Sequence, residues 1–490
     1  MSMRIQKMFL TIFIICLAWP TRYVFADDAT TSTSSAVSLA TTTPSSTLNA
    51  TTTPSTSSGL NGQGSVLGLQ APTVPPIIAA MKAAKVELAG VSLNHALTPV
   101  YKNVKNKKSK KITKTLTGYQ LSAQDIALAI LDPGTNNTII IKGMQTGKSM
   151  TFNDPAVDVA LVKFNGVNSK FVVNRPAGGQ VVALKYLISK TDSGSKKSIE
   201  AGLSPAIYVP YSPDFAQPDV LAYGASYIDG VVAKAAGQLK YLHSQAIPGK
   251  DLTAAIPPAM IKALVYAEHT DTNTVLNGGD VQGTINQLNI LFALNEGDAY
   301  NYSLSTAGAR GIAQFIPSTY ASLVSRHPEA GLTADFAAGM SNHVNAIKAM
   351  YLLLDDYAGY IRIKAASGFA EGHIFEYGAA SYNGGTTRVA NAVKTFGDNW
   401  NMDHSGEINA LTSQVESGKL KVKSLKAQIK KTADKKAKAA LNSQLAATQS
   451  QLADNQNQLD NLKSASLRAE TINYLNKIYK VVHYFNDKQV

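Results

Sequence analysis

The sequence predicts a mainly helical protein preceded by a smaller region that contains β-strands. From residue 252 onward, apolar residues recur at helical spacing. Between residues 138 and 187, short β-branched runs lie between Gly, Asn and Pro residues, a pattern typical of strands. Residues 408–462 carry two apolar series with a seven-residue repeat. Because 490 residues suffice for two or three domains, we assign the strands and the helices to different domains.

The first 26 residues have the pattern of an export signal. Arg4 and Lys7 precede an apolar stretch at residues 8–19, and Val24 and Ala26 are small side chains at cleavage positions. A membrane-spanning helix needs about 20 apolar residues, so this stretch is short for an anchor. We therefore expect cleavage after Ala26 and an exported protein of the periplasm, cell envelope or exterior. An uncleaved N-terminal anchor is the alternative, and it is the sole membrane attachment that we expect.

The single cysteine, Cys16, lies inside this signal. Ile15 precedes it, whereas a lipoprotein signal requires a small residue there, so we expect no lipid attachment. The exported chain would then contain no thiol. This excludes disulfides, cysteine nucleophiles and thiolate metal sites from its chemistry.

Residues 27–76 are rich in Ser, Thr and Pro and contain few large apolar residues. Such a segment buries too little surface to offset its conformational entropy, so we expect a disordered linker. The chain has a net charge of +13, and removal of Arg4, Lys7 and Arg22 leaves 13 − 3 = +10. A basic exported protein is attracted to polyanions such as the cell wall, but no basic–aromatic motif indicates specific nucleic-acid binding. The densest lysine cluster, residues 102–114, is expected to form a solvated loop.

Residues 77–250 are expected to form a small mixed α/β accessory domain. It should contain helices at residues 78–93 and 221–245 and strands at residues 138–141, 158–164, 170–174 and 180–187. The stretch from Gly143 to Ser149 resembles a phosphate-binding loop, but three residues instead of four separate its glycines. We therefore do not expect nucleotide binding.

The two heptad series predict a pair of long helices with a tight turn near residues 432–434. Asp434 is placed to cap the second helix. Two such helices joined by a short turn should fold back on each other. The sequence thus predicts an antiparallel coiled-coil hairpin at about residues 405–466.

The chemistry is expected in residues 295–317. An apolar helix at residues 285–294 brings Glu296 to its C-terminal end, where the helix dipole disfavours negative charge. Apolar neighbours such as Phe292 would desolvate the carboxyl group, and both effects raise its pKa. A protonated carboxyl group is what a general acid for glycosidic cleavage needs. Gly308 and Gly311 would let the backbone approach a sugar, and Gln314 could hydrogen-bond it.

This stretch resembles the catalytic core of soluble lytic transglycosylases, which have a goose-type lysozyme fold. The family pattern is Glu-Ser, then Ser-x-x-Gly-Ala-x-Gly-Leu-Met-Gln-x-x-Pro. The matching residues are Glu296, Ser305, Gly308, Ala309, Gly311, Gln314 and Pro317. Glu296 precedes Gly311 by 311 − 296 = 15 positions, which is the family spacing. Two further motifs follow in family order, at Ser381-Tyr382-Asn383-Gly384-Gly385 and at Glu470-Thr471 with Tyr474-Leu475.

The resemblance covers about residues 252–484 and implies a mainly α, lysozyme-like catalytic domain at residues 251–490. Its implied activity is cleavage of the glycan strands of peptidoglycan, with Glu296 as the single acid and base and 1,6-anhydro ends as the product. Its implied substrate-binding residues are Ser305, Gln314, Tyr382 and Asn383, and its implied supporting residues are Gly308, Gly311, Glu470 and Tyr474. No cofactor or metal is required, and the eight histidines lack a His-Glu-x-x-His spacing. The chain departs from the family at Gly297, Ile312-Ala313 and Lys348, and by the inserted hairpin.

Three alternatives stay open. Glu268, at the end of an apolar helix at residues 256–267, is a rival acid that requires 311 − 268 − 15 = 28 additional residues before Gly311. The same acid could support hydrolysis, as in a muramidase. The domain could instead be a degenerate wall-binding scaffold whose hairpin docks an envelope protein.

Overall fold

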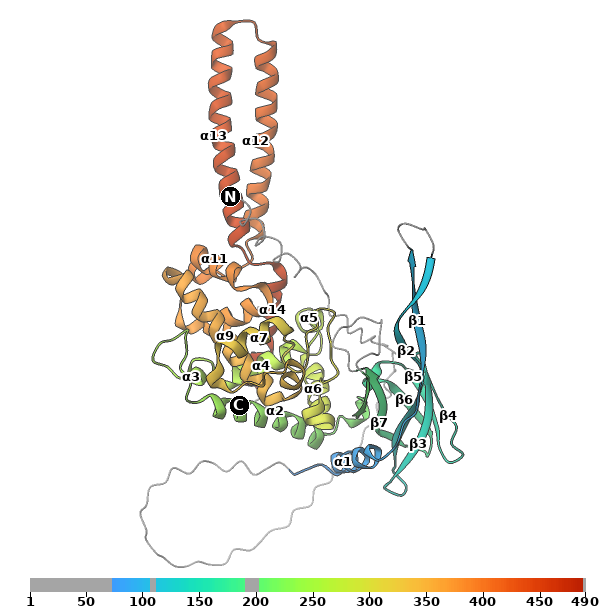
Figure 1. Ribbon diagram of the computed structural model, residues 1–490. Coiled ribbons are helices and arrows are strands. Elements are labelled where there is room, and N and C mark those ends of the chain that lie inside the picture. Colours follow the sequence, from blue (N-terminus) through green and yellow to red (C-terminus); the bar gives the residue numbers. More distant parts are fainter. Residues whose placement is uncertain (1–72, 106–111, 190–201, 488–490) are drawn as a thin grey trace, which may run out of the picture. The chain divides into compact units, whose positions relative to one another are not determined.

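The computed structural model describes residues 73–105, 112–189 and 202–487, and residues 73–490 form one compact unit. It is mainly helical with a smaller antiparallel sheet region, as the sequence predicted (Figure 1). The expected signal, residues 1–26, and almost all of the expected linker, residues 27–76, lie outside the described residues. Within the described residues, no helix has the length and apolar character that crossing a membrane requires.

The sheet has the strand order β4-β3-β2-β7-β8, and β1 pairs with β2 outside this path. Its strands are β1 (His95–Lys105), β2 (Ile112–Asp132), β3 (Asn137–Thr146), β4 (Ser149–Phe152), β7 (Gln180–Ser189) and β8 (Leu203–Tyr208). β5 (Asp158–Lys163) and β6 (Lys170–Arg175) form a separate antiparallel pair. The four strands expected from sequence correspond to β3, β5, β6 and β7.

The lysine cluster, which we expected to form a loop, lies in part on two paired strands, and its residues 106–111 lie outside the described residues. β1 and residues 112–124 of β2 pair along their length, while β3 and β7 pair with β2 only from residue 124 onward. The first half of β2 and β1 therefore form a two-stranded ribbon that continues beyond the sheet (Figure 1). Lys102 lies on β1 and Lys114 on β2 of this ribbon.

The two faces of β2 pack on different partners because alternate side chains point to opposite faces of a strand. Ala127 and Ala129 face a core shared with helix α1 (Pro76–Ala89), whose approach the small side chains permit. Ile126, Leu128 and Ile130 face a second core, which includes Val159 of β5. The sheet is thus buried on both sides.

The helix α2 (Pro218–Leu239), expected in the accessory domain, packs largely with the helical part, while Val220 near its start lies in the core shared with α1. Its buried residues Ile228, Val232 and Leu239 lie in the helical core. At Gly224 a Cβ atom would lie 1.9 Å from the Asn289 carbonyl oxygen, so the α2 backbone touches helix α6 directly.

The helical part is built around α9 (His343–Lys364), which is buried on nearly all sides. The other helices are α3 (Leu252–Ala255), α4 (Pro258–Glu268), α5 (Thr272–Leu276), α6 (Val281–Asn295), α7 (Pro317–Arg326), α8 (Phe336–Ser341), α10 (Ile374–Gly384), α11 (Thr386–Phe396) and α14 (Ala469–Asp487). α14 packs against α4, α5 and α10, so the last described helix returns to the first part of the helical core.

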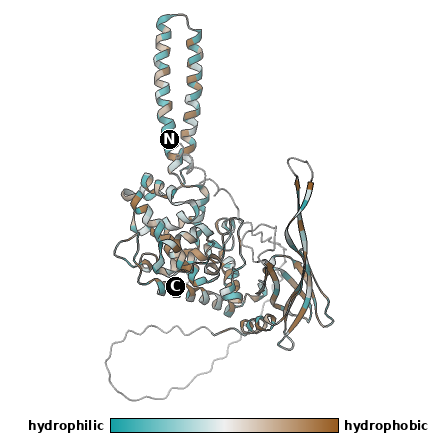
Figure 2. Ribbon diagram, in the orientation of Figure 1, coloured by the Kyte–Doolittle hydropathy of each residue, from teal (hydrophilic) through white to brown (hydrophobic). Residues whose placement is uncertain are grey.

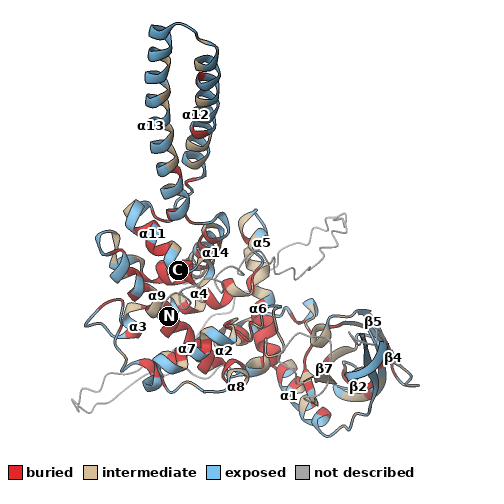
Figure 3. Ribbon diagram, turned by 45° about the horizontal axis from the view of Figure 1, so that its top comes forward, coloured by how far each residue is buried: buried red, intermediate tan, exposed pale blue. Residues whose placement is uncertain are grey.

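A two-helix hairpin lies between α11 and α14. It consists of α12 (Ser405–Lys431) and α13 (Lys435–Ala465), which pack along each other (Figure 1). The Asp434 side chain accepts a hydrogen bond from the Ala437 amide at 2.6 Å, so it caps α13 as predicted. Most residues of both helices are exposed, and Val415, Leu425 and Leu459 are among the few that are buried (Figure 3).

Candidate active site

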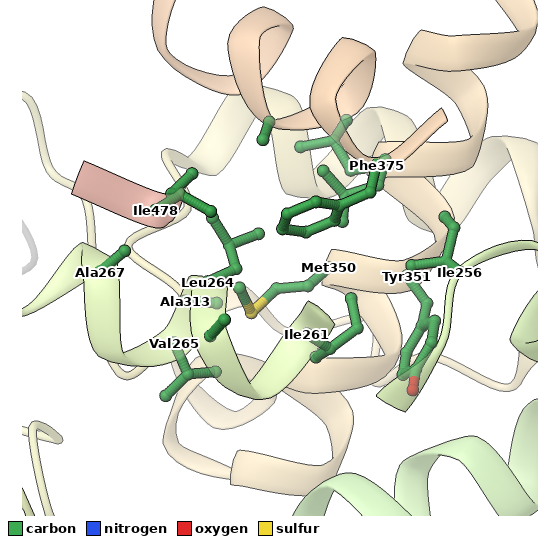
Figure 4. Close-up of a cluster of buried hydrophobic side chains, with 14 of the residues drawn as sticks. Ile256, Ile261, Leu264, Val265, Ala267, Ala313, Met350, Tyr351, Phe375 and Ile478 are labelled. Atoms are coloured by element: carbon green, nitrogen blue, oxygen red, sulfur yellow. The ribbon is translucent and has the colours of Figure 1, made fainter. Parts of the chain in front are cut away.

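The helix α4 ends at Glu268. Pro258 occupies its first turn, where a missing amide proton costs nothing, and Ile261, Leu264 and Val265 are fully buried. Figure 4 shows this apolar cluster, in which Ala267 of α4 lies near Ala313 of the loop before α7 and near Ile478 of α14. The cluster fixes the end of α4, and hence Glu268, against two segments that are distant in sequence.

The Glu268 carboxylate is held by the last described helix. The Tyr474 hydroxyl of α14 donates a hydrogen bond to Glu268 Oε1. Lys477 lies one turn further along α14, and its Nζ donates to the Thr270 carbonyl oxygen at 3.2 Å. Burial raises the pKa of Glu268, while the Lys477 charge and the Tyr474 hydrogen bond oppose that rise. The residue as a whole keeps partial solvent exposure, while burial desolvates its carboxyl group.

Tyr382 of α10 lies in the same group of side chains. Burial and the neighbouring Glu268 charge raise the pKa of Tyr382, and the same two causes act on Tyr474. The Tyr382 hydroxyl donates to the Ala313 carbonyl oxygen. Glu268, Tyr382 and Tyr474 therefore form one cluster, built from α4, α10 and α14.

The loop at residues 303–316 is fastened to this cluster at two consecutive carbonyl groups. His269 Nε2 lies 2.8 Å from the Ile312 carbonyl oxygen, and Tyr382 binds the next carbonyl, that of Ala313. The His269 ring also stacks on Tyr300 with centroids 3.7 Å apart. The residue that follows the candidate acid thus positions the loop that carries Gln314.

The glycine and serine residues of the loop have structural roles. Gly311 has φ +68°, and a Cβ atom there would lie 2.4 Å from the Met340 carbonyl oxygen, so a side chain does not fit. Ser305 Oγ accepts from the Ala309 amide at 2.9 Å and closes the turn around Gly308. Gln314 Nε2 donates to the Gly311 carbonyl oxygen at 2.7 Å. These bonds hold the loop in a single compact shape.

The remaining predicted residues hold α10 and α14 together. Asn383 Oδ1 accepts from the Thr471 hydroxyl at 3.0 Å, and a Cβ atom at Gly384 would lie 2.5 Å from the same hydroxyl oxygen. The Asn383 side chain therefore contacts α14, where it accepts the hydrogen bond of Thr471. Glu470 is exposed, so Thr471 and Tyr474, rather than Glu470, hold the start of α14.

Glu296 lies in a different cluster. It follows α6 with φ +45°, forms an ion pair with Lys82 Nζ at 2.7 Å, and accepts a hydrogen bond from the Tyr223 hydroxyl. Its side chain is 31% exposed, and its partners come from α1 and α2. Phe292, which we expected to desolvate it, packs instead against Tyr266 and Tyr227.

The structure therefore places the two candidate acids in different clusters. The rival, Glu268, is the glutamate that lies with Tyr382 and Tyr474, while Glu296 is ion-paired at the boundary with the sheet region. Sequence reasoning missed His269 and Lys477 entirely. The spacing of Tyr474 and Lys477, three residues apart on one helix face, was the available signal for Lys477.

Searches of protein-family models, curated proteins and solved structures found no match to this chain. Within the part of the chain that the structure describes, no three His, Cys, Asp or Glu side chains are grouped to hold a metal ion.

Proposed function

We propose that this protein is a peptidoglycan lytic transglycosylase in which Glu268 is the single catalytic acid and base. The observation that carries the proposal is a partly exposed glutamate at a helix end whose pKa is raised by burial, fixed by Tyr474 and bordered by Tyr382. Tyr382 and Tyr474 lie in the two motifs that resemble the family. A lysozyme-like fold for the helical part, with α12 and α13 as an inserted coiled coil, belongs to the same proposal.

In the proposed reaction, protonated Glu268 gives its proton to the oxygen that joins N-acetylmuramic acid to N-acetylglucosamine. The bond from C1 to that oxygen breaks, and the N-acetyl group of the muramic residue stabilises the cationic sugar. The Glu268 carboxylate then takes the proton of the C6 hydroxyl group as its oxygen attacks C1. The product is a 1,6-anhydro end, and Glu268 is again protonated.

The other residues have supporting roles in this proposal. Tyr474 orients the Glu268 carboxyl group through its hydrogen bond, and Lys477 limits the rise of the Glu268 pKa. His269 and Tyr382 fix the loop by binding the carbonyl groups of Ile312 and Ala313. Gln314 is the next residue of this loop. General acid–base catalysis of this type contributes roughly 10²–10⁴ in rate.

The test is digestion of purified peptidoglycan sacculi by residues 27–490, with mass spectrometry of the soluble products. We expect 1,6-anhydro-muramic ends, and a rate lowered roughly 10²–10⁴-fold in Glu268→Gln. Glu296→Gln is the matched control, since it removes the other candidate carboxylate, and it should retain activity. Loss of activity in Glu296→Gln alone would refute the assignment, and reducing muramic ends would identify a hydrolysing muramidase.

A wall-binding scaffold without activity is the second candidate. The observation that favours it is that the Glu268 carboxyl group already has partners within the protein. The Tyr474 hydroxyl already occupies one carboxylate oxygen, and Lys477 lies close enough to oppose protonation. If the parent protein binds sacculi but releases no muropeptide, the scaffold function is correct. Loss of an envelope partner on deletion of residues 405–466 would then identify the hairpin as its docking site.

A further inference from the structure

The ribbon of β1 and residues 112–124 of β2 has one apolar face. Residues that are paired across two antiparallel strands point to the same face. The register pairs Leu97 with Leu121, Pro99 with Tyr119 and Tyr101 with Leu116; one register shift precedes the first pair and the other falls between Val100 and Tyr101. The opposite face carries Thr98 with Gln120 and Lys102 with Thr115.

This apolar face is uncovered. Leu97, Tyr101, Leu116 and Tyr119 are 39%, 56%, 45% and 43% exposed, which is high for large hydrophobic side chains that lie next to one another. Ile112, near the end of the ribbon, is 60% exposed. Hydrophobic residues reach the described end of the ribbon in Figure 2. Contiguous apolar side chains on a soluble surface indicate a binding site for a partner or a membrane.

The charge around this face has a single sign. Residues 102–114 contain seven lysines, and the sequence has no Asp or Glu from residue 95 to residue 124. On the apolar face itself, Lys114 is paired with Asn103, next to the pair of Tyr101 and Leu116. The partner that fits must therefore offer an apolar surface bordered by negative charge.

We propose that the ribbon lies flat in the headgroup region of an anionic phospholipid bilayer. The leucines and Ile112 would enter the boundary with the acyl chains, and Tyr101 and Tyr119 would lie at headgroup depth, which tyrosine prefers. Lys114, which shares the apolar face, would extend its ammonium group to a lipid phosphate while its stem covers apolar surface. This attachment is independent of the N-terminal signal and of Glu268.

The helical hairpin provides an internal comparison. Lys419, Lys423, Lys426 and Lys430 lie on one side of α12, so this helix is also strongly basic. Of its large hydrophobic side chains, only Leu420 is prominently exposed among the described residues of α12. A purely electrostatic attraction would use both lysine clusters, whereas the proposed site requires the apolar face and therefore only the ribbon.

The experiment is flotation of residues 27–490 with vesicles of phosphatidylglycerol mixed with phosphatidylcholine, and with vesicles of phosphatidylcholine alone. We expect binding to the mixed vesicles and little to the neutral ones. Lys114→Gln should weaken binding about fivefold, since one lysine near an anionic surface contributes about 1 kcal/mol. Tyr101→Ser with Leu116→Ser should weaken it about tenfold through lost apolar burial.

Two matched controls complete the test. Val162→Ser removes an exposed apolar side chain from β5, and Lys423→Gln with Lys430→Gln removes two hairpin charges. Both should bind the mixed vesicles as the parent does, and circular dichroism should show that all variants are folded. The proposal is wrong if the parent does not float with the mixed vesicles, or if the hairpin variant loses as much binding as the ribbon variants. The first of these outcomes would assign the apolar face to a protein partner.

Discussion

Replacing His343 by glutamine should remove a large part of the dependence of stability on pH. His343 begins α9 and is 4% exposed. Its Nε2 lies 2.8 Å from the Ala299 carbonyl oxygen, which can only accept, so Nε2 carries the proton. Its Nδ1 then accepts from the Tyr227 hydroxyl at 2.9 Å. The neutral ring satisfies both partners, and a second proton would place a charge in the core.

The size of the effect follows from the pKa of this ring. Burial lowers the pKa of His343 from 6.5 to about 4. Between these values the unfolded chain binds a proton that the folded protein excludes, so stability is present above pH 6.5 and is lost as pH falls toward 4. For a 2.5-unit difference, the loss from pH 7.5 to pH 4.5 is about 2.5 kcal/mol. Domains are stable by roughly 5–15 kcal/mol, so this loss is a large fraction.

The assay is urea unfolding of the parent and of His343→Gln at pH 7.5 and pH 4.5. Glutamine offers an amide donor and a carbonyl acceptor but does not titrate, so the variant should lose about 2.5 kcal/mol less than the parent between the two pH values. Some dependence will remain, because burial also lowers the pKa of His269 to about 4. His243→Gln is the control, since its side chain is 76% exposed. Equal losses in the parent and in His343→Gln would refute the reasoning.

Three further outcomes are expected. Glu268→Gln should be at least as stable as the parent at pH 8. The pKa of Glu268 is raised in the folded protein, so its contribution to stability is lost as the pH rises from 4.5 through the pKa of the folded state. Thermal unfolding at pH 4 and pH 8 measures this. Lys477→Met should raise the pKa of Glu268 further, so the decline of sacculus digestion with rising pH should shift to higher pH. Gly311→Ala should cost at least about 2 kcal/mol in chemical unfolding, because it combines a left-handed backbone with contact on the Met340 carbonyl group.

Each of these has a matched comparison. Glu470→Gln changes an exposed carboxylate and should leave the pH dependence of stability unchanged. Lys480→Met removes a lysine of the same helix that binds the Val275 and Leu276 carbonyl groups, and should not move the activity profile. Gly308→Ala keeps a positive φ but has no atom nearer than 3.7 Å to the new Cβ, so it should cost less than Gly311→Ala. A control variant that changes the measured quantity as much as its test variant would contradict the corresponding argument.

The helices were predictable from sequence because their signals are local. The heptad series and Asp434 predicted α12, α13 and the cap between them, and the structure confirms the bond from the Ala437 amide to Asp434. α4 and α6 begin or end within a few residues of the expected positions. In each, apolar spacing and a capping or proline residue act within one or two turns.

The ribbon was not predictable by the same reasoning. Lysines in residues 102–114 resemble a solvated loop because strands are usually identified by a buried face. Here both faces of the ribbon are largely exposed, and pairing with β1 rather than burial holds the first half of β2. A pairing between segments with weak individual signals is not encoded in either segment alone.

The surroundings of the two glutamates were not predictable for a related reason. The family spacing counts residues, and it selected Glu296 because 15 positions separate it from Gly311. The chain inserts α5 and α6 between Glu268 and the loop, so spatial proximity no longer follows sequence distance. His269 restores that proximity through the Ile312 carbonyl group, a contact that spacing does not reveal. The motifs on α10 and α14 were informative because both helices reach Glu268.

The hydrogen bond between Tyr474 and Glu268 spans 206 residues of sequence, which has a consequence for biosynthesis. A nascent chain that has grown only as far as the hairpin already contains Glu268, the glycine loop and Tyr382, but it has neither Tyr474 nor Lys477 to orient the carboxyl group. The candidate acid is therefore assembled only after α14 has been made and has docked between α4 and α10. A chain truncated before α14 should retain most of the motif residues but lack the two side chains, Tyr474 and Lys477, that orient the Glu268 carboxyl group and limit its pKa.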